Sequence, residues 1–249
     1  MALAAKTGAF APAPAPERHV MVEIVPEGRA AVEAQLADGL LPMHRSDQVE
    51  AQVRSFFAAH AIPGIVCAPK GPLPEGAIQI GVSFPFRVDG VRVRSAACVS
   101  AGELGRRQTP WDVAAGLSTS RLPVAAELLA VIELGRTHAV DVGFFGSAAL
   151  QAWTGLPYME ASSDVDIVAT ARSSEGLCAF HTDLVVFTQR YSRRYDVEVA
   201  VPGGLGVKLS ELVSDVSTVL GRGIEGVRLV DRRRLLEEID KVSPAVATP

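Results

Sequence analysis

Two aspartates in the second half of the chain, Asp164 and Asp166, have the residue type and spacing needed to hold a metal ion. The run around them, SDVDIV, alternates polar and apolar residues, which predicts a strand with both carboxylates on one face. Two carboxylates side by side repel each other, by roughly 1 kcal/mol in water and about 4 kcal/mol near a protein surface at ~4 Å. A cation is therefore expected between them, and Mg²⁺ with a polyphosphate is the natural candidate.

A Gly-Ser pair, Gly146 and Ser147, lies upstream of these aspartates. The apolar run before Gly146 predicts a buried strand, and the segment after Ser147 predicts a short helix. The turn between them would present backbone N–H groups at a helix N-terminus, which suits a phosphate. Taken alone, a Gly-Ser pair is usually a turn and cap, and an Asp-x-Asp pair is usually the solvent face of an edge strand. Their order in one strand-turn-helix-loop-strand frame favours a joint phosphate and metal site.

A second acidic pair, Asp196 and Glu198, lies on one face of a strand predicted over 195–201. Lys208 follows on a returning strand, where its charge could neutralise a phosphate. The alternatives are a solvated strand surface for the acidic pair and an exposed side chain for Lys208. These residues add to the candidate site if the two acidic strands are neighbours.

The elements that precede this region predict a small α/β unit that ends near Gly105. Strands are expected over 19–25, 63–68, 77–84 and 91–99, with helices over 28–38 and 47–60. Asp89-Gly90 between two apolar runs predicts a hairpin turn. Asp47 and Glu50 predict a capping box, and His60 would cap the end of the same helix.

Several single residues have ordinary explanations. His19 and His44 have no partners at metal-ligand spacing, and the two tryptophans are expected in the core or in a cleft wall. Three cations are expected on solvated surface, with phosphate contact across a domain cleft as the alternative: Lys70, Arg92 and Arg94. Three widely spaced cysteines are expected as buried free thiols, which favours a reducing cytoplasm: Cys67, Cys98 and Cys178.

The elements around the acidic strands are also predicted from local signals. Thr109-Pro110-Trp111-Asp112 has the form of a helix start, and a second helix is expected over 123–136. After the Asp-x-Asp strand, a helix is expected over 173–181, and 183–188 is either its continuation or a strand. The last predictions are a helix over 210–220, a strand over 227–230 and a final helix capped by Asp231.

Composition excludes several classes of protein. The chain has 249 residues, 48% of them hydrophobic and 21% charged, and a formal charge of −4. These values indicate a globular protein and argue against one that coats nucleic acid. No apolar run reaches the ~18 residues of a membrane span, and the Ala/Pro-rich start lacks the pattern of a signal peptide.

One stretch carries a resemblance to a known family. The run GSAALQAWTGLPYMEASSDVDIV, over 146–168, resembles the signature of the phosphoribosyl-dephospho-CoA transferases, the holo-acyl-carrier-protein synthases of malonate decarboxylase. Its most specific parts are Gln151, WTGLPY over 153–158 and SDVD over 163–166. The chain departs from the family at Ala148-Ala149, where an aromatic residue is common. The likeness is strongest over about 139–209.

That family belongs to the nucleotidyltransferase superfamily, whose hallmark is a Gly-Ser turn followed by an Asp-x-Asp strand and a third carboxylate from a later strand. The resemblance implies Mg²⁺ as cofactor and favours Asp196 as the third metal ligand or general base, with Glu198 as the alternative. It implies catalytic and metal-binding roles for Asp164, Asp166 and Asp196, and substrate binding by Gly146, Ser147, Lys208 and Glu198.

The implied reaction transfers a prosthetic group from triphosphoribosyl-dephospho-CoA to a serine of the malonate decarboxylase acyl-carrier subunit, with release of pyrophosphate. No nucleic acid or membrane partner is expected. Arginine clusters at 190–194 and 232–234 are expected on solvated faces, with docking of an acidic carrier as the alternative. Two other functions stay open: a nucleotidyltransferase for another acceptor (a small molecule, RNA or a protein), and a non-catalytic binding module on the same scaffold.

These observations predict an α/β (α+β) chain. An N-terminal small α/β domain is expected over 17–108, and a C-terminal nucleotidyltransferase-like domain with a mixed sheet over 109–243. Residues 1–16 and 244–249 are expected as tails, the first of them disordered. The active site is expected in the cleft between the domains.

Overall fold

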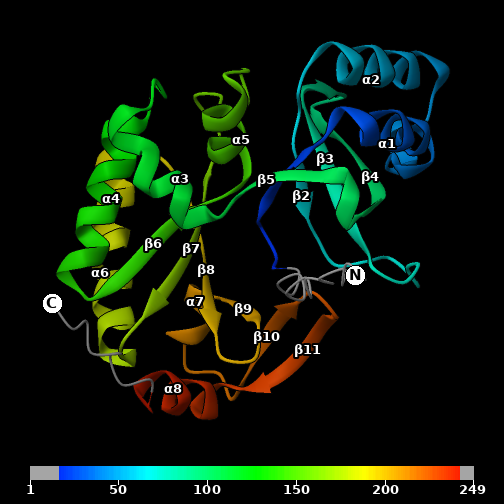
Figure 1. Ribbon diagram of the computed structural model, residues 1–249. Coiled ribbons are helices and arrows are strands. Elements are labelled where there is room, and N and C mark those ends of the chain that lie inside the picture. Colours follow the sequence, from blue (N-terminus) through cyan, green and yellow to red (C-terminus); the bar gives the residue numbers. More distant parts are fainter. Residues whose placement is uncertain (1–16, 242–249) are drawn as a thin grey trace, which may run out of the picture.

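The computed structural model describes residues 17–241 and contains two β-sheets with helices packed on them (Figure 1). The N-terminal sheet has five strands in the order β4-β3-β2-β1-β5, and the C-terminal sheet has six in the order β11-β10-β9-β8-β7-β6. Each sheet has its own cluster of buried apolar residues. The predicted α/β (α+β) fold is confirmed. The predicted tails lie outside the described residues.

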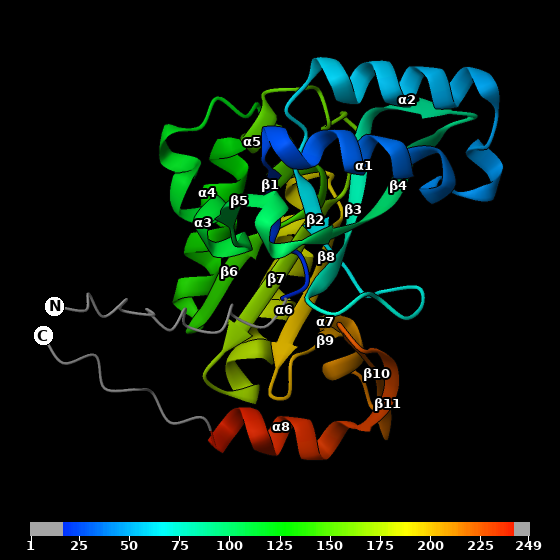
Figure 2. The ribbon, with the colours of Figure 1, turned by 45° about the vertical axis from the view of Figure 1, so that its right-hand side comes forward.

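The N-terminal sheet is antiparallel throughout. Its strands are β1 (Met21–Ile24), β2 (Gly64–Val66), β3 (Ala77–Val88), β4 (Val91–Ser100) and β5 (Leu104–Gln108). Helices α1 (Pro26–Gly39) and α2 (Asp47–Ala59) pack against each other beside this sheet (Figure 2). Alternate residues of β3, among them Ile80, Val82 and Phe84, are buried, as the alternation predicted. The hairpin turn is also confirmed, because Asp89 and Gly90 have φ angles of 50° and 77°.

Two predictions for this part of the chain are wrong. The N-cap of α2 is Ser46, whose hydroxyl accepts a hydrogen bond from Val49 N at 3.4 Å, and not Asp47. Serine one position earlier offers the short side-chain oxygen that this geometry requires. The sheet also extends past Gly105, because β5 returns to pair with β1.

The C-terminal sheet is mixed. Its strands are β6 (Val140–Phe144), β7 (Val165–Ala171), β8 (Tyr195–Val201), β9 (Leu205–Lys208), β10 (Thr218–Gly223) and β11 (Gly226–Asp231). Only β7 and β8 pair in parallel, through the crossover helix α6 (Ser174–Tyr191). The other helices of this part are α3 (Pro110–Gly116), α4 (Ala125–Thr137), α5 (Gly146–Thr154), α7 (Leu209–Leu212) and α8 (Arg232–Lys241). Figure 1 shows α4 and α6 together on one side of β6 and β7, which leaves the other face toward the N-terminal part.

The structure resolves one open prediction here and overturns two. Helix α6 runs unbroken through 183–188, so the strand alternative is wrong. The helix predicted over 210–220 is also wrong: α7 is a single turn, and β10 follows because it pairs with both β9 and β11. Cys178 is exposed on the outer face of α6, not buried, while Cys67 and Cys98 are half-buried.

The segment that follows α5 joins the two sheets. The hydroxyl of Tyr158, a fully buried residue, donates to Ser83 O on β3 at 2.8 Å. Arg92 on β4 donates to Tyr158 O at 2.7 Å and to Phe84 O at 3.2 Å. Arg92 is therefore a buried connector, and its expected position on solvated surface is wrong.

None of the described helices has the length and apolar character needed to cross a membrane.

Candidate active site

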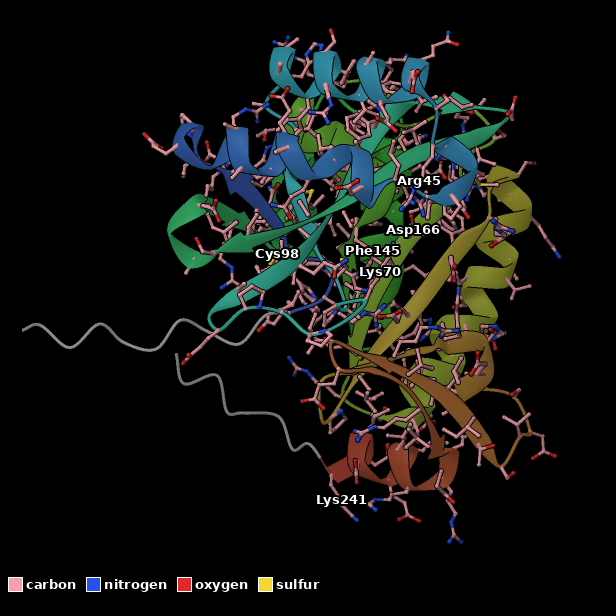
Figure 3. All side chains as sticks on the ribbon, turned by 90° about the vertical axis from the view of Figure 1, so that its right-hand side faces the viewer. Arg45, Lys70, Cys98, Phe145, Asp166 and Lys241 are labelled. Atoms are coloured by element: carbon pink, nitrogen blue, oxygen red, sulfur yellow. The ribbon has the colours of Figure 1, made fainter. Side chains whose placement is uncertain are left out.

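The three predicted carboxylates meet on one face of the C-terminal sheet. Strands β7 and β8 pair in parallel, and Asp166 lies directly opposite Asp196. Val165 and Ile167, which alternate with the aspartates, are fully buried on the opposite face. Asp164 lies just before β7 and continues the same alternation. Figure 3 shows Asp166 and Phe145 near the middle of the molecule, where strands of the two sheets overlap in the view.

The Gly-Ser turn packs directly on Asp166. Phe145 N donates to Asp166 O at 3.1 Å, and α5 begins at the next residue, Gly146. Gly146 has a φ of 64°, and a Cβ atom there would lie 2.0 Å from Asp166 Oδ2. Only glycine fits this position, because it tolerates the left-handed backbone and leaves room for the carboxylate. Ser147 is the second residue of α5, so the first turn of the helix and Asp166 border the same space.

Asp166 lies in an electrostatically unfavourable position. Burial, together with the charges of Asp164 and Asp196, raises its pKa to about 6. The charges of Arg94 and Lys208 act in the opposite direction. An added cation or a bound phosphate-metal complex would therefore find concentrated negative charge and two basic side chains at this site.

Two of the carboxylates are paired with basic side chains. Arg194 lies 2.5 Å from Asp164, and the ammonium of Lys208 contacts both oxygens of Asp196. Arg193 positions the same region, since it donates to Ser163 O at 2.7 Å and forms an ion pair with Glu127 at 2.8 Å. Arg193 and Arg194 of the 190–194 cluster therefore contact the acidic segment or its neighbours, while Arg190 lies over the ring of Tyr191.

The donor set fits a hard cation such as Mg²⁺ by its chemistry, with carboxylate oxygens as ligands. Among residues 17–241, no three His, Cys, Asp or Glu side chains converge closely enough to hold a metal as they stand. The side chains of Asp164 and Asp196 are 37% and 36% exposed, and that of Arg194 is 79% exposed. Such exposed ion pairs are weak, so both aspartates are free to turn toward a metal beside Asp166.

Glu198 occupies a different environment from the three aspartates. Its side chain is bound by Arg18 at 2.8 Å and by His19 at 2.9 Å, and the residue is only 8% exposed. Burial raises its pKa, but the hydrogen bonds and charges of His19 and Arg18 outweigh this and lower the pKa. The N-terminal segment thus crosses the C-terminal sheet and fixes Glu198. The carboxylate opposite Asp166 is Asp196, the favoured one of the two.

His19 is the site residue that the sequence did not reveal. Its ring stacks on Phe145, with ring centroids 3.9 Å apart, beside the Gly-Ser turn. The sequence showed no metal-ligand partner for His19 and gave no other sign of its position. Its partners are Phe145 and Glu198, which lie far away along the chain. Trp111 and Trp153 both lie at half-buried or exposed positions in cavity walls, consistent with the expectation.

Arg94 is the cation that the N-terminal sheet directs at this site. It pairs with Ser83, whose carbonyl accepts the Tyr158 hydroxyl, and it shares a strand face with the connector Arg92. Arg94 is exposed, and its charge acts on Asp166. Arg94 is therefore on solvated surface, as expected, and phosphate contact across the cleft stays a prediction.

Two family models match the chain over nearly its full described length. The C-terminal domain model of phosphoribosyl-dephospho-CoA transferase MdcG matches residues 112–233, and the N-terminal domain model matches residues 17–110. A phosphoribosyl-dephospho-CoA transferase of Xanthomonas euvesicatoria pv. vesicatoria is 31% identical over 186 residues, which are 74% of this chain and 85% of the relative. The chain belongs to the phosphoribosyl-dephospho-CoA transferase family.

Other members of that family are similar over a comparable or greater span. The transferase of Xanthomonas axonopodis pv. citri is 29% identical over 184 residues, covering 74% of this chain and 85% of the relative. That of Bradyrhizobium diazoefficiens is 27% identical over 231 residues, covering 89% and 92%. No solved structure matches the chain. Membership in the family supports a transferase activity.

The segment that carried the resemblance to the transferase family has a structural role. Arg106 lies over the ring of Trp153 at 4.0 Å, and Gln151 accepts a hydrogen bond from Met159 N at 2.7 Å. Gly155, with a φ of 71°, ends α5, and Tyr158 reaches Ser83. In this transferase the WTGLPY segment ties the C-terminal sheet to the N-terminal sheet.

Proposed function

We propose that the protein transfers the phosphoribosyl-dephospho-CoA group from triphosphoribosyl-dephospho-CoA to a serine of the acyl-carrier subunit of malonate decarboxylase, with release of pyrophosphate. The observation that carries this proposal is the contact between the Gly-Ser turn and Asp166, directly opposite Asp196. A phosphate-binding helix terminus and a set of carboxylates then border one space. The family relationship supplies the identity of the transferred group.

The triphosphate would be held by groups from both sheets. The first N–H groups of α5 and the Ser147 hydroxyl would bind its outer phosphates, since helix N-termini favour anions. Arg94 would reach the same phosphates from β4. Lys208 would leave its ion pair with Asp196 and bind a phosphate oxygen instead. Together these groups fix the attacked phosphorus in line with the incoming hydroxyl.

Asp164, Asp166 and Asp196 would hold Mg²⁺. When bound there, Mg²⁺ supplies positive charge that offsets the carboxylates and stabilises charge on the attacked phosphate and on the leaving pyrophosphate. Asp166 would be the central ligand because it lies directly opposite Asp196 and the Gly146 turn packs against its carboxylate.

The carrier serine would attack the phosphorus next to the ribosyl group. The new bond joins the serine oxygen to that phosphorus, and the bond from phosphorus to the pyrophosphate oxygen breaks. Asp196, which contacts Lys208, would accept the serine proton once Lys208 had moved to the phosphates. The products are a phosphodiester on the carrier and free pyrophosphate.

The test is mass spectrometry of apo acyl-carrier subunit after incubation with the protein, Mg²⁺ and triphosphoribosyl-dephospho-CoA. We expect a mass gain equal to the phosphoribosyl-dephospho-CoA group, and none with Asp166→Ala. Labelling of a different acceptor, with none of the carrier, would favour a nucleotidyltransferase of other specificity. Donor binding without transfer to any acceptor would favour a binding module.

A further inference from the structure

A cavity of about 580 Å³ lies beside the acidic site, on the same face of the C-terminal sheet. Its floor includes Val168 of β7 and Glu198 of β8, which follow Asp166 and Asp196 on that face. Alternate residues on a strand lie roughly 7 Å apart, so the cavity begins one side chain beyond the carboxylates. Its size falls in the range of about 300–1,000 Å³ typical of small-molecule sites.

Three separate segments form the walls of this cavity. One is the N-terminal segment 17–19, held in place by the ion pair between Arg18 and Glu198. The second is the start of α3, where Trp111 is 37% exposed. The third consists of the glycine-rich turns 203–206 and 223–226. Glycines leave flat backbone walls here, and a Cβ atom on Gly206 would lie 1.9 Å from Glu198 Oε1.

The lining combines one large aromatic side chain with several charged groups. Trp111 and Ile224 offer apolar surface to a planar ring. Glu17 and Glu225 can accept hydrogen bonds from an amino group. Arg228, an exposed residue, forms no ion pair with any described residue and can bind a phosphate.

We propose that this cavity binds the adenosine part of the donor, with the adenine ring against Trp111. The inference rests on the proposed function, because it takes dephospho-CoA as part of the donor. The adenosine carries the triphosphoribosyl group, so only one ribose separates it from the attacked phosphate, and the cavity begins one side chain beyond the carboxylates. Arg228 then contacts the diphosphate that leads to the pantetheine arm, which extends outward from the cavity.

The chain offers a matched pair of variants to test this, because it contains only two tryptophans. Trp153→Phe leaves Trp111 as the single tryptophan, and Trp111→Phe leaves Trp153, which lines a separate cavity beneath Arg106. We expect dephospho-CoA and AMP to change the emission of Trp111 in a saturable way, and 4′-phosphopantetheine to leave it unchanged. The emission of Trp153 should not respond to any of the three.

A second variant tests the cavity independently of fluorescence. Ala200 lies on the floor of the cavity, and Ala200→Phe would fill it. Calorimetry should show dephospho-CoA binding weakened about tenfold or more, equivalent to roughly 1.4 kcal/mol. Circular dichroism melts check that this variant folds.

The outcomes separate the two proposals. Carrier labelling together with a silent Trp111 at saturating dephospho-CoA would overturn the cavity assignment and leave the proposed function standing. A response of Trp111 to 4′-phosphopantetheine equal to that to AMP would also overturn it. Saturable binding at Trp111 without any carrier labelling would support the cavity and count against the proposed function.

Discussion

At the scale of single residues, the site is built on one close contact. Gly146 can approach Asp166 only because it has no side chain, and its φ of 64° is one that other residues adopt with strain. The contact places the amides of α5 beside a carboxylate that burial and neighbouring charges already disfavour. The proposed phosphate binding and cation binding would therefore depend on the same few atoms.

Gly146→Ala should strongly slow transfer while the fold survives. An alanine in the left-handed region costs about 1–2 kcal/mol, and its Cβ would also displace the Asp166 carboxylate. A displacement of this size is expected to lower kcat by about a hundredfold or more. The matched control is Gly155→Ala at the other end of α5, where φ is 71° but no atom lies within 4 Å. If both variants lose similar stability but only Gly146→Ala loses transfer activity, the contact between Gly146 and Asp166 is supported. Equal transfer activities of the two variants would contradict it.

Asp166→Asn should stabilise the metal-free protein at neutral pH. The pKa of Asp166 is about 6 in the folded protein, above the ordinary value of 3.8, so folding favours the protonated form. The stabilisation from this group is complete below about pH 3.8 and is lost as the pH rises to about 6. At pH 7 the charged carboxylate thus destabilises the fold by on the order of 1–3 kcal/mol.

Thermal melts in the presence of a chelator measure this effect. Asp166→Asn should raise Tm at pH 7, and the gain should shrink toward zero near pH 4. The control Asp141→Asn changes an exposed aspartate on β6 and should leave Tm nearly unaltered at both values. A lower Tm for Asp166→Asn at pH 7 would show that the carboxylate is stabilised by its surroundings.

At the scale of elements, the sequence predicts those that depend on local signals and misses those that depend on pairing with distant strands. The β6-α5-β7 unit was predictable because its apolar run, glycine turn and alternation are all local. Strand β10 was not, since Leu209, Leu212 and Val219 also fit a helical pattern and only pairing with β9 and β11 selects the strand. The place of His19 was equally hidden, because its partner Glu198 lies 179 residues away.

The segment after α5 makes a prediction at this scale. Tyr158→Phe removes the hydrogen bond to Ser83 O and leaves a buried carbonyl oxygen unpaired, which should cost about 1–3 kcal/mol. Urea unfolding measures the loss. Tyr191→Phe is the control, because its ring stacks on Phe187 at the exposed end of α6, and it should change stability by less than about 0.5 kcal/mol. Equal losses would mean that the hydroxyl of Tyr158 is not what joins the sheets.

At the scale of the whole molecule, the N-terminal sheet completes a site whose carboxylates all come from the other sheet. Arg18 and His19 fix Glu198, Arg92 binds the segment after α5, and the charge of Arg94 lowers the pKa of Asp166. The carboxylates were predictable from their spacing, but these basic partners were not, because their position depends on how the two sheets pack. A C-terminal half alone would keep the acidic residues, α5 and Lys208, and would lose Arg94 and the basic side chains that bind Glu198 and Tyr158 O.

Arg94→Gln tests this division of labour. The variant removes a charge that reaches the phosphates from the N-terminal sheet, so the KM for the donor should rise about tenfold to a hundredfold, in line with the roughly 1.5–3 kcal/mol of a hydrogen bond to a charged group. Loss of this charge also removes a factor that lowers the pKa of Asp166, so more of that carboxylate is protonated near pH 6 and the fall in activity on the acid side should begin at a higher pH. Arg94→Lys should recover part of the affinity, because a point charge remains.

The control is Arg54→Gln, which changes an exposed arginine on α2 and should leave the KM for the donor and the pH profile unchanged. If Arg94→Gln transfers as efficiently as the unmodified protein, the N-terminal sheet acts only as a scaffold and the phosphates are held by α5 and Lys208 alone.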